Sequence, residues 1–202
     1  MKVGFSGRCA RAALPADGRV VVSFLAALFA WARSRRFFES FEIDEAELGI
    51  GKHKIKLSPN QTDREIAYKI WVELSTRKIG LPIDLEHDVI EEVYDLWYAF
   101  FGITRELIKT VPVQKLHRDG TARIVNLSID VLNEGLRPHL TKWQARFRRW
   151  YSQQIREGGE LAHLTPQEIQ RRFSDFQALS TDLRIVNERL IAYRKKMRAL
   201  AF

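Results

Sequence analysis

The chain has 202 residues, of which 46% are hydrophobic and 29% charged, and this composition excludes a disordered or collagen-like protein. Its single cysteine, Cys9, excludes an intramolecular disulfide framework and a cysteine-based zinc site. The net charge is +8, but residues 1–36 hold seven Lys/Arg against one acid, which leaves 26 basic and 24 acidic residues after Arg36. The basic balance therefore does not by itself predict nucleic-acid binding by the main domain.

The N-terminal region divides into two parts. Residues 1–18 show no periodicity and are interpreted as a flexible tail or a mis-assigned start. Residues 20–32 form an uncharged run, roughly 20 Å long as a helix, which is short against a hydrocarbon thickness of about 30 Å. Flanking arginines that snorkel, with more positive charge on the C-terminal side, favour an anchor with a cytoplasmic main domain.

Two other interpretations of this run remain open. Residues 30–32 resemble a signal-peptide cleavage site, and a buried or interfacial helix of a soluble protein has a similar pattern. We predict that residues 19–36 form a membrane-anchor or interfacial helix with a basic flank, at the inner membrane of a bacterium, with a cytoplasmic protein as the alternative. The predicted anchor residues are Val20, Phe24, Leu25, Leu28, Phe29, Trp31, Arg33, Arg35 and Arg36.

Residues 37–57 have the alternating pattern of a β-hairpin. Phe41, Ile43 and Glu45 alternate with the residues at 42, 44 and 46. Glycines at 49 and 51 interrupt the run, and alternation resumes at residues 54–57. Period-two patterning around a glycine-containing turn predicts two paired strands.

Residues 58–202 have helical periodicity and predict a helical bundle. Thr62 and Glu65 have the spacing of a capping box for a first helix, and a second helix is expected over residues 84–109 with an acidic first half. The expected fold class is mainly α: an antiparallel bundle of four to five helices, with one β-hairpin and an N-terminal apolar helix.

A third helix is predicted from about residue 121 and contains the basic, aromatic stretch at 135–151. Its apolar stripe crosses Gly135 and Pro138 in phase, which indicates a kink near Glu134 rather than an end. The pattern predicts that three aromatic side chains are largely buried: Trp143, Phe147 and Trp150. The basic residues flank this stripe as a candidate basic surface, made of Arg137, Lys142, Arg146, Arg148 and Arg149.

Partners of this basic surface are left open. The acidic residues of the second helix are the favoured counterpart, and anionic lipid, nucleic acid and an acidic protein are the alternatives. Stacking on nucleic acid requires exposed aromatic rings beside the arginines, so nucleic acid is not favoured.

The last helical region opens at Thr165, where Pro166 and Glu168 complete an N-terminal signature, and a longer helix follows near Ser174. Its apolar stripe has coiled-coil-like spacing. We favour packing of this stripe on the chain's own helices, and the alternative is contact with a second copy or a protein partner. The candidate partner face consists of Leu183, Val186, Leu190, Tyr193 and Met197.

Motifs for catalysis are not found in the sequence. The chain has no phosphate-binding glycine loop, no nucleophile elbow and no zinc-protease motif. Asp84, His87 and Glu91 have helical spacing for metal ligands, but a carboxylate-bridged site in a bundle needs a second such motif. We therefore predict no catalytic residue, no metal and no cofactor.

Two resemblances bear on function. Arg156 and His163 are spaced as the Arg and His of HEPN-type ribonucleases are, although two glycines interrupt the motif here. The stretches KIKLSPN, AYKIWVELSTRKIGLPID and GLRPHLTKWQARFRRWY, within residues 41–151, look like small bacterial proteins with one N-terminal hydrophobic segment and a cytoplasmic helical domain. That resemblance implies bacterial origin and membrane attachment, and it implies no activity and no functional residue.

The expected function is that of a membrane-anchored, non-enzymatic scaffold or protein-interaction module. Membrane lipid is the expected partner, together with an unidentified protein or a second copy of the chain. The alternative is a soluble basic helical bundle that binds nucleic acid, such as a HEPN-like ribonuclease.

Overall fold

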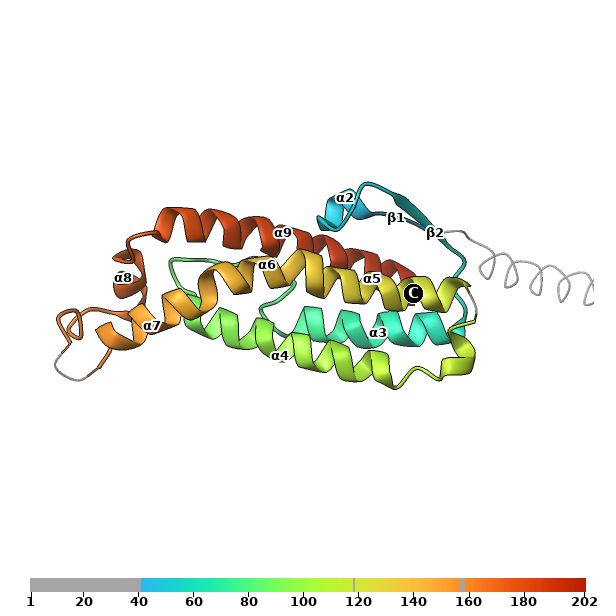
Figure 1. Ribbon diagram of the computed structural model, residues 1–202, viewed down its shortest axis with the longest axis horizontal. Coiled ribbons are helices and arrows are strands. Elements are labelled where there is room, and N and C mark those ends of the chain that lie inside the picture. Colours follow the sequence, from blue (N-terminus) through green and yellow to red (C-terminus); the bar gives the residue numbers. More distant parts are fainter. Residues whose placement is uncertain (1–40, 118, 157–158) are drawn as a thin grey trace, which may run out of the picture. The chain divides into compact units, whose positions relative to one another are not determined.

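The computed structural model describes residues 41–117, 119–156 and 159–202. This part of the chain is mainly helical and has one small two-stranded antiparallel sheet (Figure 1). Within it, no helix is both long and apolar enough to cross a membrane. The predicted tail at 1–18 and the predicted anchor at 19–36 lie outside the described residues.

The predicted strand pairing is confirmed. Strands β1 (Phe41–Asp44) and β2 (Lys54–Leu57) are antiparallel, with Phe41 opposite Leu57 and Ile43 opposite Ile55. The expected alternation through Glu45 is wrong, because Glu45–Leu48 form a short helix, α2. The Asp44 carboxylate accepts a hydrogen bond from the Ala46 amide (2.9 Å), and Gly49 ends the turn in the left-handed region, with φ of 68°.

Helix α3 (Gln61–Thr76) begins earlier than the predicted capping box. Its N-cap is Asn60, whose side chain accepts from the Asp63 amide (3.2 Å) while the Asp63 carboxylate accepts from the Asn60 amide (2.9 Å). Asp63 is buried and also accepts from the Thr121 hydroxyl (2.6 Å) of the next-but-one helix. This long-range contact fixes the cap at Asn60 instead of Thr62.

Helix α4 (Ile90–Lys109) begins six residues later than predicted. The Asp84 carboxylate accepts from the Glu86 amide (3.0 Å), which holds residues 84–88 in a turn. Helix α4 then begins at Ile90, whose amide donates to the side-chain oxygen of Gln170 (2.9 Å), far along the chain. Its N-terminus is capped from another helix, which local sequence could not indicate.

The third helical segment bends where the prediction placed a kink. After η1 (Val113–Lys115), helix α5 (Asp119–Asp130) continues into a π-helix, η2 (Val131–Leu136), then α6 (Arg137–His139), a second π-helix, η3 (Leu140–Gln144), and α7 (Ala145–Gln154). Pro138 has no amide proton to donate, and the wider π turns absorb this interruption without ending the helix.

Helix α8 (Pro166–Arg171) begins where predicted, and α9 (Phe176–Ala201) begins close to the predicted start at Ser174. Helix α8 begins with the capping box of Thr165 and Glu168, and Pro166 is its first residue. Helix α9 follows after a short turn. The sequence signature at 165–168 was therefore correct.

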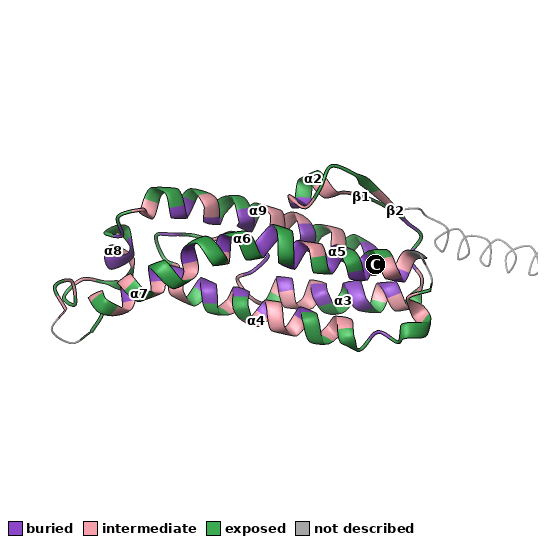
Figure 2. Ribbon diagram, in the orientation of Figure 1, coloured by how far each residue is buried: buried purple, intermediate pink, exposed green. Residues whose placement is uncertain are grey.

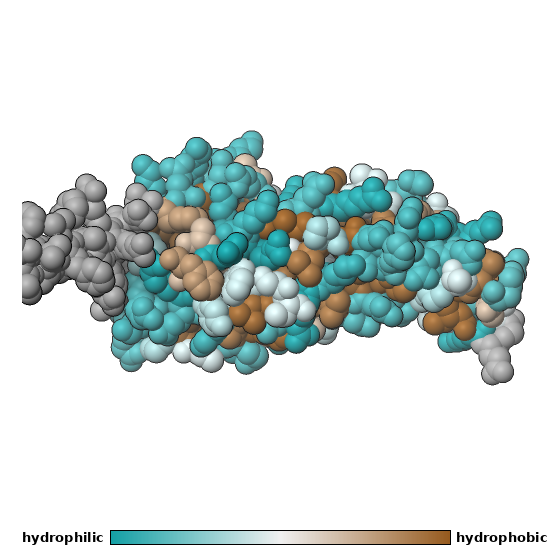
Figure 3. Space-filling model, turned by 180° about the vertical axis from the view of Figure 1, so that it is seen from behind, coloured by the Kyte–Doolittle hydropathy of each residue, from teal (hydrophilic) through white to brown (hydrophobic). Residues whose placement is uncertain are grey.

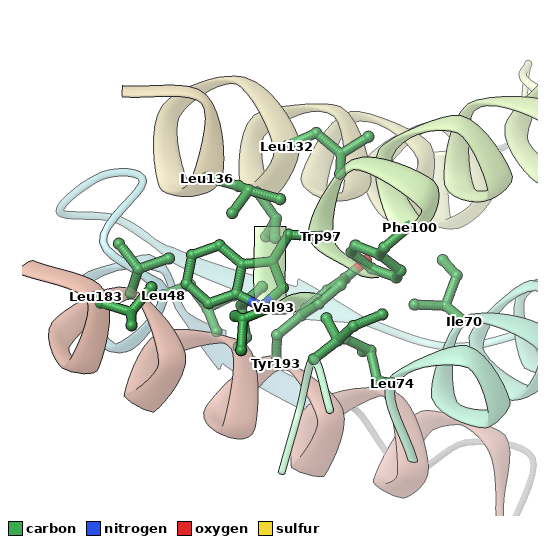
Figure 4. Packing of buried hydrophobic residues seen from close by; sticks show 14 of the residues in the cluster. Leu48, Ile70, Leu74, Val93, Trp97, Phe100, Leu132, Leu136, Leu183 and Tyr193 are labelled. Atoms are coloured by element: carbon green, nitrogen blue, oxygen red, sulfur yellow. The ribbon is translucent and has the colours of Figure 1, made fainter. Parts of the chain in front are cut away.

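The long helical segments α3, α4, α5 to α7, and α9 lie side by side and alternate in direction (Figure 1). Their facing sides are buried and their outer sides exposed (Figure 2). Trp97 and Phe100 of α4 meet Leu136 of η2 and Tyr193 of α9 in the centre (Figure 4). The core is thus shared by all four segments.

Candidate functional site

The aromatic residues of the basic stretch are mostly buried, as predicted. Trp143 and Phe147 are 3% and 0% exposed. Trp150 is only half-buried: its ring contacts Phe147 and Phe173, with centroids 6.1 Å and 5.2 Å apart. Trp150 also lines a shallow hollow together with Arg149. The prediction therefore holds for the first two residues and only in part for Trp150, because Phe173 covers one side of its ring.

The candidate basic surface is largely compensated within the chain. Arg148 forms an ion pair with Asp95 of α4, which agrees with the predicted acidic counterpart. Arg146 pairs instead with Asp175, just before α9. Of the remaining three, Arg137 lies 4.7 Å over the Phe101 ring and Lys142 lies 4.7 Å over the Trp143 ring. The guanidinium group of Arg149 makes no hydrogen bond or ion pair among the described residues.

The candidate partner face on α9 is buried in the core of the chain, which agrees with the favoured interpretation that this stripe packs on the chain's own helices. Its five residues are at most 4% exposed and belong to the core: Leu183, Val186, Leu190, Tyr193 and Met197. The spacing that resembles a coiled coil is satisfied within the chain, since α9 packs along α3 and against the hairpin region.

Exposed aromatic rings gather elsewhere. Tyr68 and Phe202 are 49% and 73% exposed, and the Phe202 ring meets Tyr68 and the half-buried Trp71 edge-on, at 6.2 Å and 5.3 Å. On the face drawn in Figure 3, hydrophobic atoms reach the surface between hydrophilic ones. Exposed aromatic rings are typical of protein interfaces.

A buried polar network lies at the π-helical segment and was missed by the sequence reasoning. His139, at the end of α6, is 2% exposed; its Nδ1 lies 2.9 Å from a carboxylate oxygen of Asp182 on α9, and its Nε2 lies 3.2 Å from the Tyr94 hydroxyl on α4. The Trp143 indole donates to the same oxygen of Asp182 (2.8 Å). Three helical segments are therefore joined by one histidine and one carboxylate.

Burial and hydrogen bonding set the charge states in this network. Burial lowers the pKa of His139, and the hydrogen bond and charge of Asp182 oppose that effect in part. For Asp182, burial opposes ionisation, but hydrogen bonds from His139 and Trp143 hold its pKa below the ordinary value. Burial raises the pKa of Tyr94. The network therefore holds a neutral imidazole between a phenol and a carboxylate, and its observable role is to connect helices.

Protonation of His139 predicts a pH dependence of stability. Because the folded-state pKa is lower than that of the unfolded chain, the unfolded state binds the proton first as the pH falls below about 6.5. The stabilisation is complete above that pH and is lost as the pH falls through the folded-state pKa. Urea unfolding between pH 7.5 and 5 should show this decrease in the wild type, and H139Q should flatten it. Equal slopes in the two proteins would contradict the assignment.

The structure brings together only some of the remaining residues that the sequence suggested as a metal site or a ribonuclease motif. Asp84 and His87 lie 2.6 Å apart on the surface; their hydrogen bond lowers the pKa of Asp84 and raises that of His87. Across the described ranges, no group of three His, Cys, Asp or Glu could hold a metal. Arg156 and His163 are exposed, and residues 157 and 158 between them lie outside the described ranges. The resemblance of this segment to the ribonuclease motif therefore stays a prediction.

A second feature that the sequence did not reveal is the junction of α8 with residues 85–90. The Gln170 side chain is fully buried; it accepts from the Ile90 amide (2.9 Å) and donates to the carbonyls of Leu85 (3.3 Å) and Asp88 (3.0 Å). Gln167 donates to the His87 carbonyl (2.9 Å). These bonds fix α8 and the start of α4 together, and a hollow of about 310 Å³ opens between this junction and α9.

No family model, curated protein or solved structure matches this chain.

Proposed function

We propose that this chain is a membrane-anchored, non-enzymatic scaffold or protein-interaction module of bacterial type. Residues 19–36 would tether an antiparallel helical bundle to the cytoplasmic face of the inner membrane. The observation that carries the proposal is the uncharged run at residues 20–32, followed by Arg33, Arg35 and Arg36. An apolar segment with positive charge on one side favours this orientation, and the arginines would meet acidic headgroups.

The contacts of the bundle support a tethering role more than a catalytic one. The cations of the basic stretch mainly pair with Asp95 and Asp175 or lie over aromatic rings, and the buried His139 is enclosed by its own network. The exposed rings of Tyr68 and Phe202 offer a protein partner or a second copy an aromatic contact surface. The resemblance to small bacterial proteins with one hydrophobic segment agrees with the same proposal.

A soluble nucleic-acid-binding bundle is the second candidate function. It is favoured by one observation, the half-exposed ring of Trp150 beside Arg149, which has no ion pair within the described part of the chain. Aromatic rings next to arginines stack on single-stranded nucleic acid, and such binding weakens steeply with salt.

Fractionation of cells with matched variants tests the proposal. The wild type should stay in the membrane pellet after an alkaline carbonate wash. L25R/L28R, which places two charges in the apolar run, should move the protein to the soluble fraction, because each charge at the centre of a span costs about 2.5–3.5 kcal/mol. L25I/L28I keeps the apolarity and should behave like the wild type.

The opposite pattern would support the second candidate. A wild-type chain found entirely in the soluble fraction, which binds single-stranded RNA at low salt and loses it in W150A/R149A, would overturn the membrane proposal.

A further inference from the structure

The hollow beside α8 gathers polar side chains from three parts of the chain. Glu86 comes from the turn before α4, Arg171 from the end of α8, and Gln177 and Arg184 from the first turns of α9. In Figure 1, α8 lies at the end of the bundle where α9 begins. A volume of about 310 Å³ is at the lower end of the range for small-molecule sites.

Two of the three walls of this hollow, α8 and the turn before α4, are held together by hydrogen bonds. The three hydrogen bonds of Gln170 and the bond from Gln167 join α8 to residues 85–90. The capping box of Thr165 and Glu168 fixes the beginning of α8. Glu86 and Arg171 therefore project from backbone that is already fixed, and this lowers the entropic cost of binding a ligand.

Two arginines line this hollow, and neither guanidinium group has a bonded partner among the described residues. Neither Arg171 nor Arg184 makes a side-chain hydrogen bond or an ion pair within the described ranges. The charge of Arg171 does help to lower the pKa of Glu168, but that carboxylate is already bound to the backbone and hydroxyl of Thr165. The side-chain amide of Gln177 is likewise free to donate. Guanidinium forks match the oxygens of a phosphate group in geometry and in charge.

The remaining lining residues indicate which other chemical group a phosphate ligand would have. The carboxylate of Glu86 lines the same hollow and makes no hydrogen bond among the described residues, so it can accept from a hydroxyl group. The half-buried ring of Phe176 adds an apolar wall. Two cations, one free amide and one free carboxylate suit a phosphate group with a hydroxyl a few bonds away.

We propose that the hollow lined by Arg171, Arg184, Gln177 and Glu86 binds the phosphate of a hydroxyl-bearing phosphate ester. Arg171 and Arg184 hold the phosphate oxygens, and Glu86 accepts from the hydroxyl. A soluble polyol phosphate and the headgroup of a hydroxylated phospholipid share this chemistry. The binding site does not depend on the proposed membrane tether.

Calorimetry on the full-length protein in detergent, with glycerol 1-phosphate as the probe, tests the site. R171A and R184A should each weaken binding about tenfold or more, which is the usual effect of a charge-assisted hydrogen bond, and the double variant should show no binding. Arg172 is exposed and adjacent in sequence but does not line the hollow, so R172A is the matched control and should bind like the wild type. Thermal melts confirm that each variant is folded.

Replacing Glu86 gives an independent test, in which phosphate binding should become stronger instead of weaker. E86Q removes a negative charge from the hollow and should bind inorganic phosphate several-fold more tightly, while its preference for glycerol 1-phosphate over inorganic phosphate decreases. Unchanged phosphate binding in R171A/R184A, equal weakening in R172A, or an unchanged preference in E86Q would each overturn the proposal.

Vesicles distinguish the two sources of the phosphate. L25R/L28R, which lacks the proposed anchor, is mixed with phosphatidylglycerol or phosphatidylcholine vesicles, with and without R171A/R184A. Sedimentation with phosphatidylglycerol that depends on the two arginines assigns the site to a lipid headgroup; binding of glycerol 1-phosphate alone assigns it to a soluble ester. If residues 19–36 prove not to anchor the protein, the calorimetric result still stands. The proposed phosphate site and the proposed membrane anchor are therefore tested separately.

Discussion

Replacing Trp97 by Ala is expected to lower the free energy of unfolding by about 3–5 kcal/mol, the usual cost of removing a large buried aromatic side chain. Trp97 is 0% exposed, and its ring meets Tyr94 (6.5 Å) and His139 (5.5 Å) edge-on between the helical segments. The lost stability has two parts: the side chain no longer buries its apolar area, and the cavity that remains cannot be closed by the four helical segments. Urea unfolding followed by circular dichroism measures it.

Two controls make this prediction specific. The Trp97 indole nitrogen is buried without a hydrogen-bond partner, so W97F removes an unsatisfied group along with part of the ring and should cost clearly less than W97A. Ile185, on α9, is 43% exposed, and I185A should change stability little. A W97A protein as stable as I185A would contradict the central packing of α4.

Replacing Gln170 by Ala is expected to cost roughly 2–4 kcal/mol, because removal of one partner leaves buried backbone groups unsatisfied. The Ile90 amide and the carbonyls of Leu85 and Asp88 all lose their hydrogen bond at once. The start of α4 also loses the group that caps it. Hydrogen exchange of the amide of Ile90 should become faster in Q170A.

Gln167 supplies the matched control for this junction. It lies on the same helix, is more exposed, and makes one hydrogen bond, to the His87 carbonyl. Q167A should cost about 1 kcal/mol or less. If Q170A and Q167A have equal stability, the three-bond arrangement of Gln170 is not what fixes α8.

Local signals in the sequence predicted the elements whose causes are local. The capping box at Thr165 and Glu168 and the strand pairing around Gly49 are set by neighbouring residues, and both were correct. The bend after Glu134 followed from Gly135 and Pro138, although its form, two π-helices, did not. The apolar spacing of the last helix predicted its buried face but not what that face would pack against.

Features that depend on distant partners could not be predicted. The capping box of α3 lies at Asn60 and Asp63 instead of at Thr62, and Asp63 also contacts Thr121, 58 residues further along the chain. Gln170 lies 80 residues from the Ile90 amide that it caps. His139 looked like an isolated histidine because Asp182 follows 43 residues later, on another helix. In the proposed phosphate site, Glu86 likewise lies far along the chain from Arg171 and Arg184.

Protease protection in bacterial spheroplasts tests the proposed tether most directly. The helical domain of residues 41–202 should resist external protease in intact spheroplasts. It should be digested once they are lysed, while the undigested protein still sediments with the membranes after a carbonate wash. Digestion of the domain in intact spheroplasts, or a protein that never sediments with the membranes, would contradict a cytoplasmic domain held at the inner membrane by residues 19–36.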